Sequence, residues 1–160
     1  MRDPFLPILL LGAGAGLASC STVRTIVGIG CGTLALYLLA LISVPGRPPT
    51  DTLFVLAWIG VGVSAALAWL PPPSWMWIRI AVASLTGLLA GGLSGTSPAA
   101  SAPAFFGMLA CAASVGVALS RRGWPLPPRI VASWLVAIAI LNAALVVLPV
   151  TPGYLPDHLE

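Results

Sequence analysis

The sequence has very little charge and few reactive side chains. It contains no lysine, a single histidine, seven arginines and four acidic residues among 160 residues, so charged residues make up only 7% of the chain. Hydrophobic residues make up 59%, which leaves too little polar surface to cover a water-soluble domain of this length. The composition therefore predicts an integral membrane protein whose main partner is the lipid bilayer.

The scarcity of ionisable residues also narrows the possible chemistry. No Asp, Glu, His or Lys falls inside a long apolar run, so we find no candidate general base, Schiff-base lysine or proton relay. His158 lies beside Asp157 near the end of the sequence, which disfavours a metal site. We therefore expect no enzymatic activity, no cofactor and no metal. The arginines form no dense basic patch, so no nucleic-acid partner is expected either.

Long apolar runs separated by turn residues define the predicted architecture. A membrane crossing needs about 20 apolar residues, and six runs come close to this length, at about 5–21, 25–44, 52–70, 75–93, 104–119 and 130–148. Most prolines fall between the runs, where they stop helices without removing hydrogen bonds that lipid cannot replace. The predicted fold is one all-α domain over residues 1–160, a polytopic transmembrane helix bundle with about six spans.

The arginines predict the orientation of this bundle. Five of them lie in or beside the first, third and fifth gaps without any acidic residue: Arg24, Arg79, Arg121, Arg122 and Arg129. The other gaps and the termini hold Arg2, Arg47 and all four acids. Because arginines near membrane ends are retained in the cytoplasm, we expect both termini on the non-cytoplasmic side. From the composition, we expect the bacterial inner (plasma) membrane.

The arginines also mark a weak internal repeat. Similar four-residue sequences begin at three of them: Arg24-Thr25-Ile26-Val27, Arg79-Ile80-Ala81-Val82 and Arg129-Ile130-Val131-Ala132. One interpretation is a repeat of three helical hairpins of roughly 50 residues each. The other is that membrane topology alone requires an arginine at these places. Three hairpins of one orientation would differ from the inverted repeats of alternating-access transporters.

Glycines one helical turn apart predict close helix packing. The pairs are Gly12 with Gly16, Gly28 with Gly32, Gly87 with Gly91, and Gly91 with Gly95. Small residues at this spacing let two helix backbones approach closely in a membrane. The packing partner is either another helix of the same chain or a second copy of the protein. The spacing does not match a glycine-rich dinucleotide-binding loop.

Neutral polar residues inside the spans are the candidates for a functional path. We select Tyr37, Ser84, Thr86 and Asn142 as a candidate polar path. Asn142 is placed near the centre of the sixth span, where its amide needs a partner, and we expect that partner on another helix. A structural hydrogen bond and a lining role for a solute path both remain open for this residue.

The first apolar run allows a different interpretation. Leu17-Ala18-Ser19-Cys20 resembles the bacterial lipobox, in which the cysteine is acylated after cleavage. Asp3 weakens the positive start that a signal peptide needs, and processing at Cys20 would put Arg24 outside the cytoplasm. We therefore favour a first span, and lipidation of Cys20 stays open.

Two stretches resemble known membrane families. Pro4-Phe5, then Arg24 with Gly28 and Gly32, then Ala57-Trp58-Ile59-Gly60 resemble the membrane domain of fusaric-acid-resistance and aromatic-acid exporters over about residues 4–93. From Asp51 onward, the same helices are similar to nickel permeases. These resemblances imply a helical bundle that moves a small solute. The cytoplasmic domain of the first family and the histidine-rich motifs of the second have no counterpart in this sequence.

Two classes of function follow. The first is an accessory or structural subunit of a membrane assembly, with other membrane subunits or a second copy as partner. The alternative is a small transporter or exporter of a neutral or organic-anion solute. The lack of charge inside the spans favours the first class, whereas a central cavity lined by Asn142, Tyr37 and the mid-span hydroxyls would favour the second.

Overall fold

The computed structural model describes residues 4–19, 23–43, 51–70, 75–95, 98–124 and 126–147. These residues form six α-helices and one short 3-10 helix, and no strand occurs among them. The elements are α1 (Phe5–Ala18), α2 (Val23–Ser43), α3 (Asp51–Ala66), η1 (Leu67–Trp69), α4 (Met76–Ser94), α5 (Pro98–Arg121) and α6 (Leu126–Val147). The all-helical prediction is therefore confirmed for this part of the chain.

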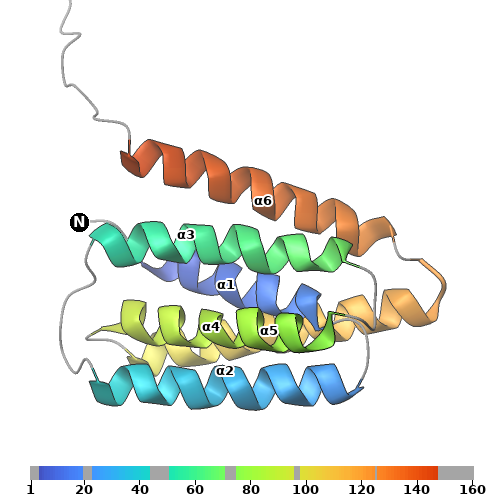
Figure 1. Cartoon of the computed structure of the whole chain (residues 1–160), viewed down its shortest axis with the longest axis horizontal. Coiled ribbons are helices and arrows are strands. Elements are labelled where there is room, and N and C mark those ends of the chain that lie inside the picture. Colours follow the sequence, from blue (N-terminus) through green and yellow to red (C-terminus); the bar gives the residue numbers. More distant parts are fainter. Residues whose placement is uncertain are drawn as a thin grey trace, which may run out of the picture.

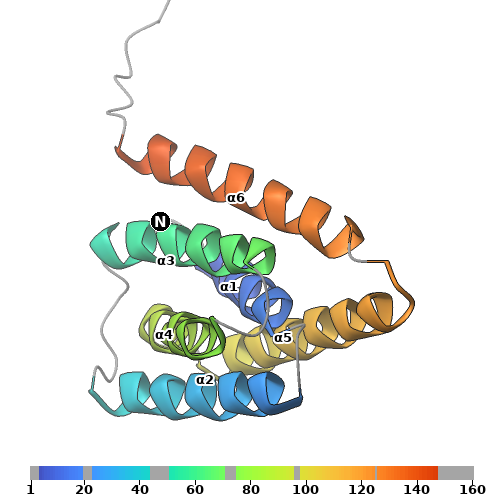
Figure 2. The ribbon, with the colours of Figure 1, turned by 45° about the vertical axis from the view of Figure 1, so that its right-hand side comes forward.

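Five helices, α2 to α6, are long and apolar enough to cross a membrane. The remaining helix, α1, has 14 residues and is about 21 Å long, which is shorter than the hydrocarbon layer of about 30 Å. Most of its residues are buried, and it packs against α5, α3 and α4. In the bundle, α1 lies between α3, α4 and α5 (Figures 1 and 2).

Helices that follow each other in sequence are not always packed together. The most extensive contacts join α2 to α4, α1 to α5, and α3 to α6, whereas α1 and α2 hardly touch. Successive helices run in opposite directions (Figure 1), and α6 lies at one side, chiefly against α3. The three sequence hairpins are therefore not equivalent packing units.

The predicted bounds hold well for α2, α3 and α4 but not for two later helices. The prediction started the fifth and sixth spans at Ala104 and Ile130, whereas α5 begins at Pro98 and α6 at Leu126. Proline at the first helical position is compatible with a helix, because the first amides have no partner there. Pro103 lies inside α5, close to its start, and its missing N–H removes one backbone hydrogen bond there.

Several predicted features lie outside the described residues. They include Arg2, Asp3, Cys20, Arg47, Asp157 and His158. The ends of the predicted first, second and sixth spans, at Ser21, Val44 and Leu148, also fall outside them.

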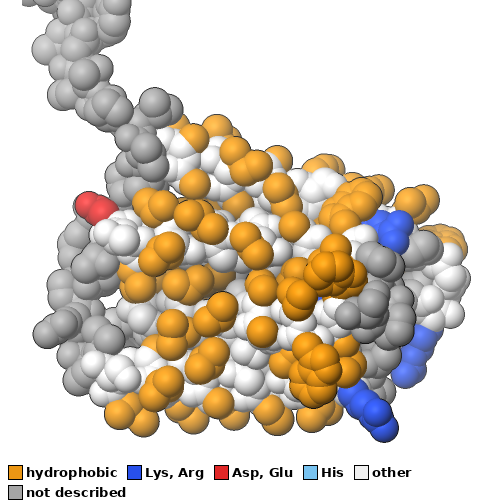
Figure 3. Space-filling model, viewed as in Figure 1, with side chains coloured by type: hydrophobic (Ala, Val, Ile, Leu, Met, Phe, Trp, Pro, Cys, Tyr) orange, Lys and Arg blue, Asp and Glu red, His pale blue; other side chains and the backbone are white. Residues whose placement is uncertain are grey.

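The alternating helix directions bring the five selected arginines to one end of the bundle. Arg24 lies at the start of α2, Arg79 at the start of α4, Arg129 at the start of α6, and Arg121 and Arg122 at the end of α5. Asp51 begins α3 at the opposite end, and Figure 3 shows the blue and red side chains at the two ends of an orange surface. We call these two ends the arginine end and the Asp51 end.

Candidate functional site

Three hydroxyl groups from three helices meet inside the bundle near the Asp51 end. The Tyr37 hydroxyl of α2 lies 2.9 Å from Ser94 Oγ of α4 and 3.5 Å from Ser101 Oγ of α5. Ser101 also donates a hydrogen bond of 2.7 Å to Ser94, and Ser94 donates one of 2.7 Å to the Ala90 carbonyl. Because the Ser94 hydroxyl proton is donated to the Ala90 carbonyl, Ser94 Oγ accepts hydrogen bonds from the hydroxyls of Tyr37 and Ser101. We call Tyr37, Ser94 and Ser101 the hydroxyl cluster.

Aromatic rings close the hydroxyl cluster. The Tyr37 ring stacks on Phe105 with centroids 6.1 Å apart, and the edge of Phe106 approaches it at 5.4 Å. Tyr37, Phe105 and both serines are buried. The hydroxyl cluster thus ties α2, α4 and α5 together within a closed apolar surround, where hydrogen bonds face little competition from water.

The other predicted path residues do not join this cluster. The Thr86 hydroxyl donates to the Ala83 carbonyl of its own helix at 2.5 Å. Ser84 Oγ is buried, has no hydrogen-bond partner among the described residues, and lies where α4 faces α2. The predicted path is therefore divided between separate places in the bundle.

Asn142 differs from its prediction in two ways. Its amide donates a 2.9 Å hydrogen bond to the Ile138 carbonyl, so its partner lies in the same helix and not on another one. A polar side chain can satisfy itself in this way through the carbonyl one turn earlier. Because α6 begins at Leu126, Asn142 also lies in the last third of the helix instead of near its centre.

The glycines of α1 lie against the backbone of α5. A Cβ added to Gly16 would lie 2.5 Å from the Leu109 carbonyl oxygen and 2.7 Å from Ala112 Cβ. A Cβ at Gly12 would collide with the Phe105 carbonyl oxygen. Only glycine therefore allows these two backbones to approach this closely.

The glycines of α4 lie against α2 in the same manner. A Cβ added to Gly91 would lie 2.7 Å from the Tyr37 carbonyl oxygen and 2.8 Å from Ala40 Cβ, and one at Gly87 would collide with the Thr33 carbonyl oxygen. On α2, Gly28 faces Ile80, and Gly32 faces Ser84. These glycines therefore pack helices within one chain.

Gly95 has a different role from the other predicted packing glycines. It follows the last residue of α4 and has a φ of 44° and a ψ of −108°. Residues with a Cβ rarely adopt a positive φ. The conformation of Gly95 thus ends the helix and allows the chain to turn.

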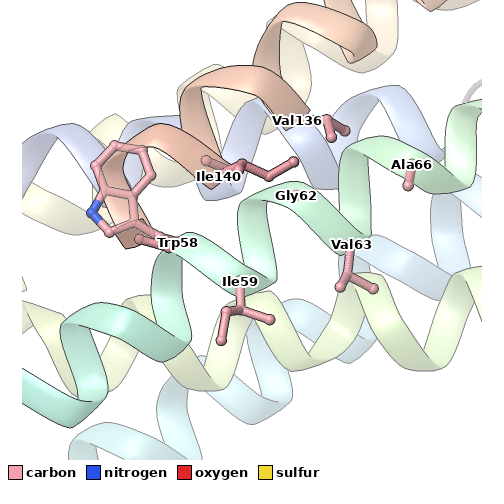
Figure 4. Close-up of a pocket in the computed structure, with 9 residues that line it drawn as sticks. Trp58, Ile59, Gly62, Val63, Ala66, Val136 and Ile140 are labelled. Carbon is pink, nitrogen blue, oxygen red and sulfur yellow. The ribbon is translucent and has the colours of Figure 1, made fainter. Parts of the chain in front are cut away.

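An apolar groove lies between α3 and α6 (Figure 4). Its volume is about 270 Å³, and it is lined by Trp58, Ile59, Gly62, Val63, Ala66, Val136, Ala139, Ile140 and Ala143. The Trp58 ring extends from α3 toward α6, and its Nε1 is buried without a hydrogen-bond partner among the described residues. We call this cavity the α3–α6 groove, and none of the predicted path residues lines it.

Sequence reasoning missed both the α3–α6 groove and two members of the hydroxyl cluster. Gly62 with Ala66, and Ala139 with Ala143, repeat the small-residue spacing of one turn, but only glycine pairs were selected. Ser94 and Ser101 fell just outside the predicted spans. Counting alanine as a small residue and extending the helices through proline would have drawn attention to all of them.

An arginine lies over a tryptophan at the arginine end of α3 and α6, the two helices that form the groove. The Arg129 guanidinium of α6 is 5.8 Å from the centre of the Trp69 ring, which belongs to η1 directly after α3. Trp69 is half exposed. The pair holds a cation at the arginine end of the helices that form the groove.

Metal-ligating and thiol groups are sparse among the described residues. No three His, Cys, Asp or Glu side chains lie close enough there to hold a metal ion. Cys31 and Cys111 are free thiols, and both are exposed on the bundle surface.

Comparison of the chain with protein-family models, curated proteins and solved structures finds no match. The resemblances to aromatic-acid exporters and nickel permeases therefore stay predictions.

Proposed function

We propose that the chain is a multi-pass protein of the bacterial inner membrane and acts as an accessory or structural subunit of a membrane assembly. The observation that carries the proposal is the hydroxyl cluster, in which buried polar groups bond to each other and join three helices. The glycine faces add close backbone contacts within the chain. The interior is thus built for packing, and the outer surface is available to partners.

The proposed placement has six crossings, with the arginine end in the cytoplasm and both termini outside. Four exposed tryptophans at the arginine end support this placement: Trp69, Trp75, Trp77 and Trp124. Indole rings favour the headgroup layer. The arginines at this end and Asp51 at the other fit the charge bias of inserted helices.

The outward face of α2 is the proposed contact with a partner subunit. This helix lies at the edge of the bundle (Figure 2), where one side packs on α4. Four of its exposed apolar residues follow one face at helical spacing, Val27, Leu34, Leu38 and Ile42, and Leu39 lies beside them. The exposed thiol of Cys31 falls on the same face. This face is suited to an apolar transmembrane helix of another subunit.

Photo-crosslinking in native membranes tests this function. A benzophenone maleimide attached to Cys31 should give a discrete protein adduct that survives solubilisation in mild detergent. Cys31→Ala should remove the adduct, whereas Cys111→Ala, which removes the exposed thiol of α5, should retain it. Labelling of lipid alone from Cys31 would contradict the subunit proposal.

Transport of a neutral or organic-anion solute is the second candidate. The buried Ser84 hydroxyl favours it, because this group has no hydrogen-bond partner among the described residues. An unsatisfied buried donor is the kind of group that a solute can satisfy. Uptake of benzoate or glycerol by proteoliposomes that contain only this protein would support transport over the subunit function.

A further inference from the structure

We propose that the α3–α6 groove and Arg129 form one binding site for an anionic phospholipid. The phosphate would bind at Arg129, and part of one acyl chain would lie in the groove. The inference rests on the membrane placement proposed above but not on the subunit function.

The groove has the composition and size for part of an acyl chain. Every residue that lines it is apolar or glycine, and small residues of both helices leave the space between them. A pocket that encloses a whole small ligand usually exceeds about 300 Å³, whereas this groove has a volume of about 270 Å³. It therefore suits a flexible hydrocarbon chain that continues into the bilayer.

The same dimensions disfavour a protein helix in the groove. A helix with its side chains is about 10–12 Å across. The α6 helix leans away from α3 only toward the Asp51 end, and the two helices are close together at the arginine end (Figures 1 and 2). A second helix would have to separate them along their length, but a single acyl chain would not.

Arg129 lies at the correct distance from the groove for a headgroup contact. It precedes Val136, the first groove residue of α6, by seven residues, which corresponds to about 10 Å along the helix. Each headgroup layer is roughly 5–8 Å thick. With the groove starting about one helical turn inside the hydrocarbon layer, Arg129 lies about 5 Å beyond the edge of that layer, beside the lipid phosphates.

The charges at this end favour an anionic headgroup. Asp51 is the only acidic residue that the structure describes, and it lies at the far end of the bundle. Within the described ranges, no carboxylate therefore competes with a phosphate for Arg129. The guanidinium is oriented by Trp69 at 5.8 Å and can offer two parallel N–H donors to phosphate oxygens.

Native mass spectrometry of the purified protein tests the site with phosphatidylglycerol and phosphatidylcholine of identical acyl chains. The wild type should retain phosphatidylglycerol at least about fivefold more strongly, the effect of one favourable basic contact. Arg129→Gln should remove this preference, whereas Arg122→Gln, at the same end but outside the groove helices, should retain it.

A second pair of variants tests the acyl-chain part. Ala66 lines the groove and is exposed, so Ala66→Leu should fill it without a buried clash and should weaken retention of both lipids. Ala81→Leu, at an exposed position on α4 outside the groove, should leave retention unchanged.

Three results would overturn the lipid site. The first is an equal effect of Arg129→Gln and Arg122→Gln on the preference for phosphatidylglycerol. The second is full lipid retention by Ala66→Leu. The third is a dimer that Ala66→Leu dissociates, because this result would identify a second copy as the occupant of the groove. If the protein separates from membranes during fractionation, both this site and the proposed placement fail. If it stays in membranes without a phosphatidylglycerol preference, only the lipid site fails.

Discussion

The Tyr37 hydroxyl lies 2.9 Å from the hydroxyl of Ser94, which is 57 residues further along the chain. This contact joins α2 to α4 at their Asp51 ends, and Ser101 extends it to α5. In the proposed membrane placement, helices gain little from leaving lipid for one another, so the bundle depends on such specific contacts together with close packing.

Removing the Tyr37 hydroxyl should therefore destabilise the protein measurably. For Tyr37→Phe we expect a loss of about 0.6–1.7 kcal/mol in the free energy of unfolding, which runs from the average to the largest value for interhelical hydrogen bonds in a membrane. Unfolding by dodecyl sulfate in mixed micelles measures this value. Ser133→Ala is the matched control, because among the described residues that exposed hydroxyl bonds only to the Arg129 carbonyl of its own helix. Equal stability of the two variants would exclude a stabilising role for the hydroxyl cluster.

A methyl group at Gly91 should separate α4 from α2. Its Cβ would lie 2.7 Å from the Tyr37 carbonyl oxygen, which belongs to a helix backbone and cannot move alone. We expect Gly91→Ala to lower the free energy of unfolding by about 1–3 kcal/mol. Gly30→Ala on α2 meets nothing within 4 Å and should be neutral or stabilising by up to about 1 kcal/mol. Thermal unfolding in detergent compares the two, and a stable Gly91→Ala would contradict the close contact.

Asn142 should tolerate an apolar replacement. Its one hydrogen bond in the described part of the chain goes to a carbonyl of its own helix, and the residue is only half-buried. We expect Asn142→Leu to change the free energy of unfolding by less than about 0.5 kcal/mol. Protein abundance and benzoate uptake in proteoliposomes should be measured together. If uptake occurs in the wild type and disappears in this variant at normal abundance, the transport function replaces the subunit function.

The proposed orientation has a direct test. A green fluorescent protein fused after Leu70 should fluoresce, because this position follows α3 at the arginine end. An alkaline phosphatase fused after Gly95 should be active, because α4 ends on the opposite side. The reciprocal fusions at the two sites serve as controls. The reverse pattern would invert the membrane orientation and would favour the lipoprotein interpretation of Cys20.

The sequence predicted the helices better than their contacts. The bounds of α2, α3 with η1, and α4 agree within two residues, because turn residues flank these apolar runs. The starts of α5 and α6 were placed too late, because prolines were taken as helix stops although a first turn accepts them. The partners of each helix could not be predicted, since apolar residues cover all sides of each helix and mark no single buried face.

The candidate site was predicted only in part for related reasons. Tyr37 was selected as a polar residue inside an apolar run, and it is the residue that joins three helices. Asn142 was selected on the same grounds but bonds within its own helix. The sequence shows which polar residues lie inside apolar runs, and a buried polar group needs a hydrogen-bond partner. Only the three-dimensional arrangement decides where that partner lies.

The pairing of α1 with α5 has a consequence for synthesis. The glycine face of α1 packs against α5, where Gly12 faces Phe105 and Gly16 faces Leu109, and each partner is made 93 residues later. At about 5–20 residues per second, the ribosome needs roughly 5 to 19 seconds to produce this partner. Throughout that interval, α1, the shortest of the six α-helices that the structure describes, is without its main contact. In the proposed membrane placement, the nascent chain is therefore most exposed to insertion errors and proteolysis before α5 emerges.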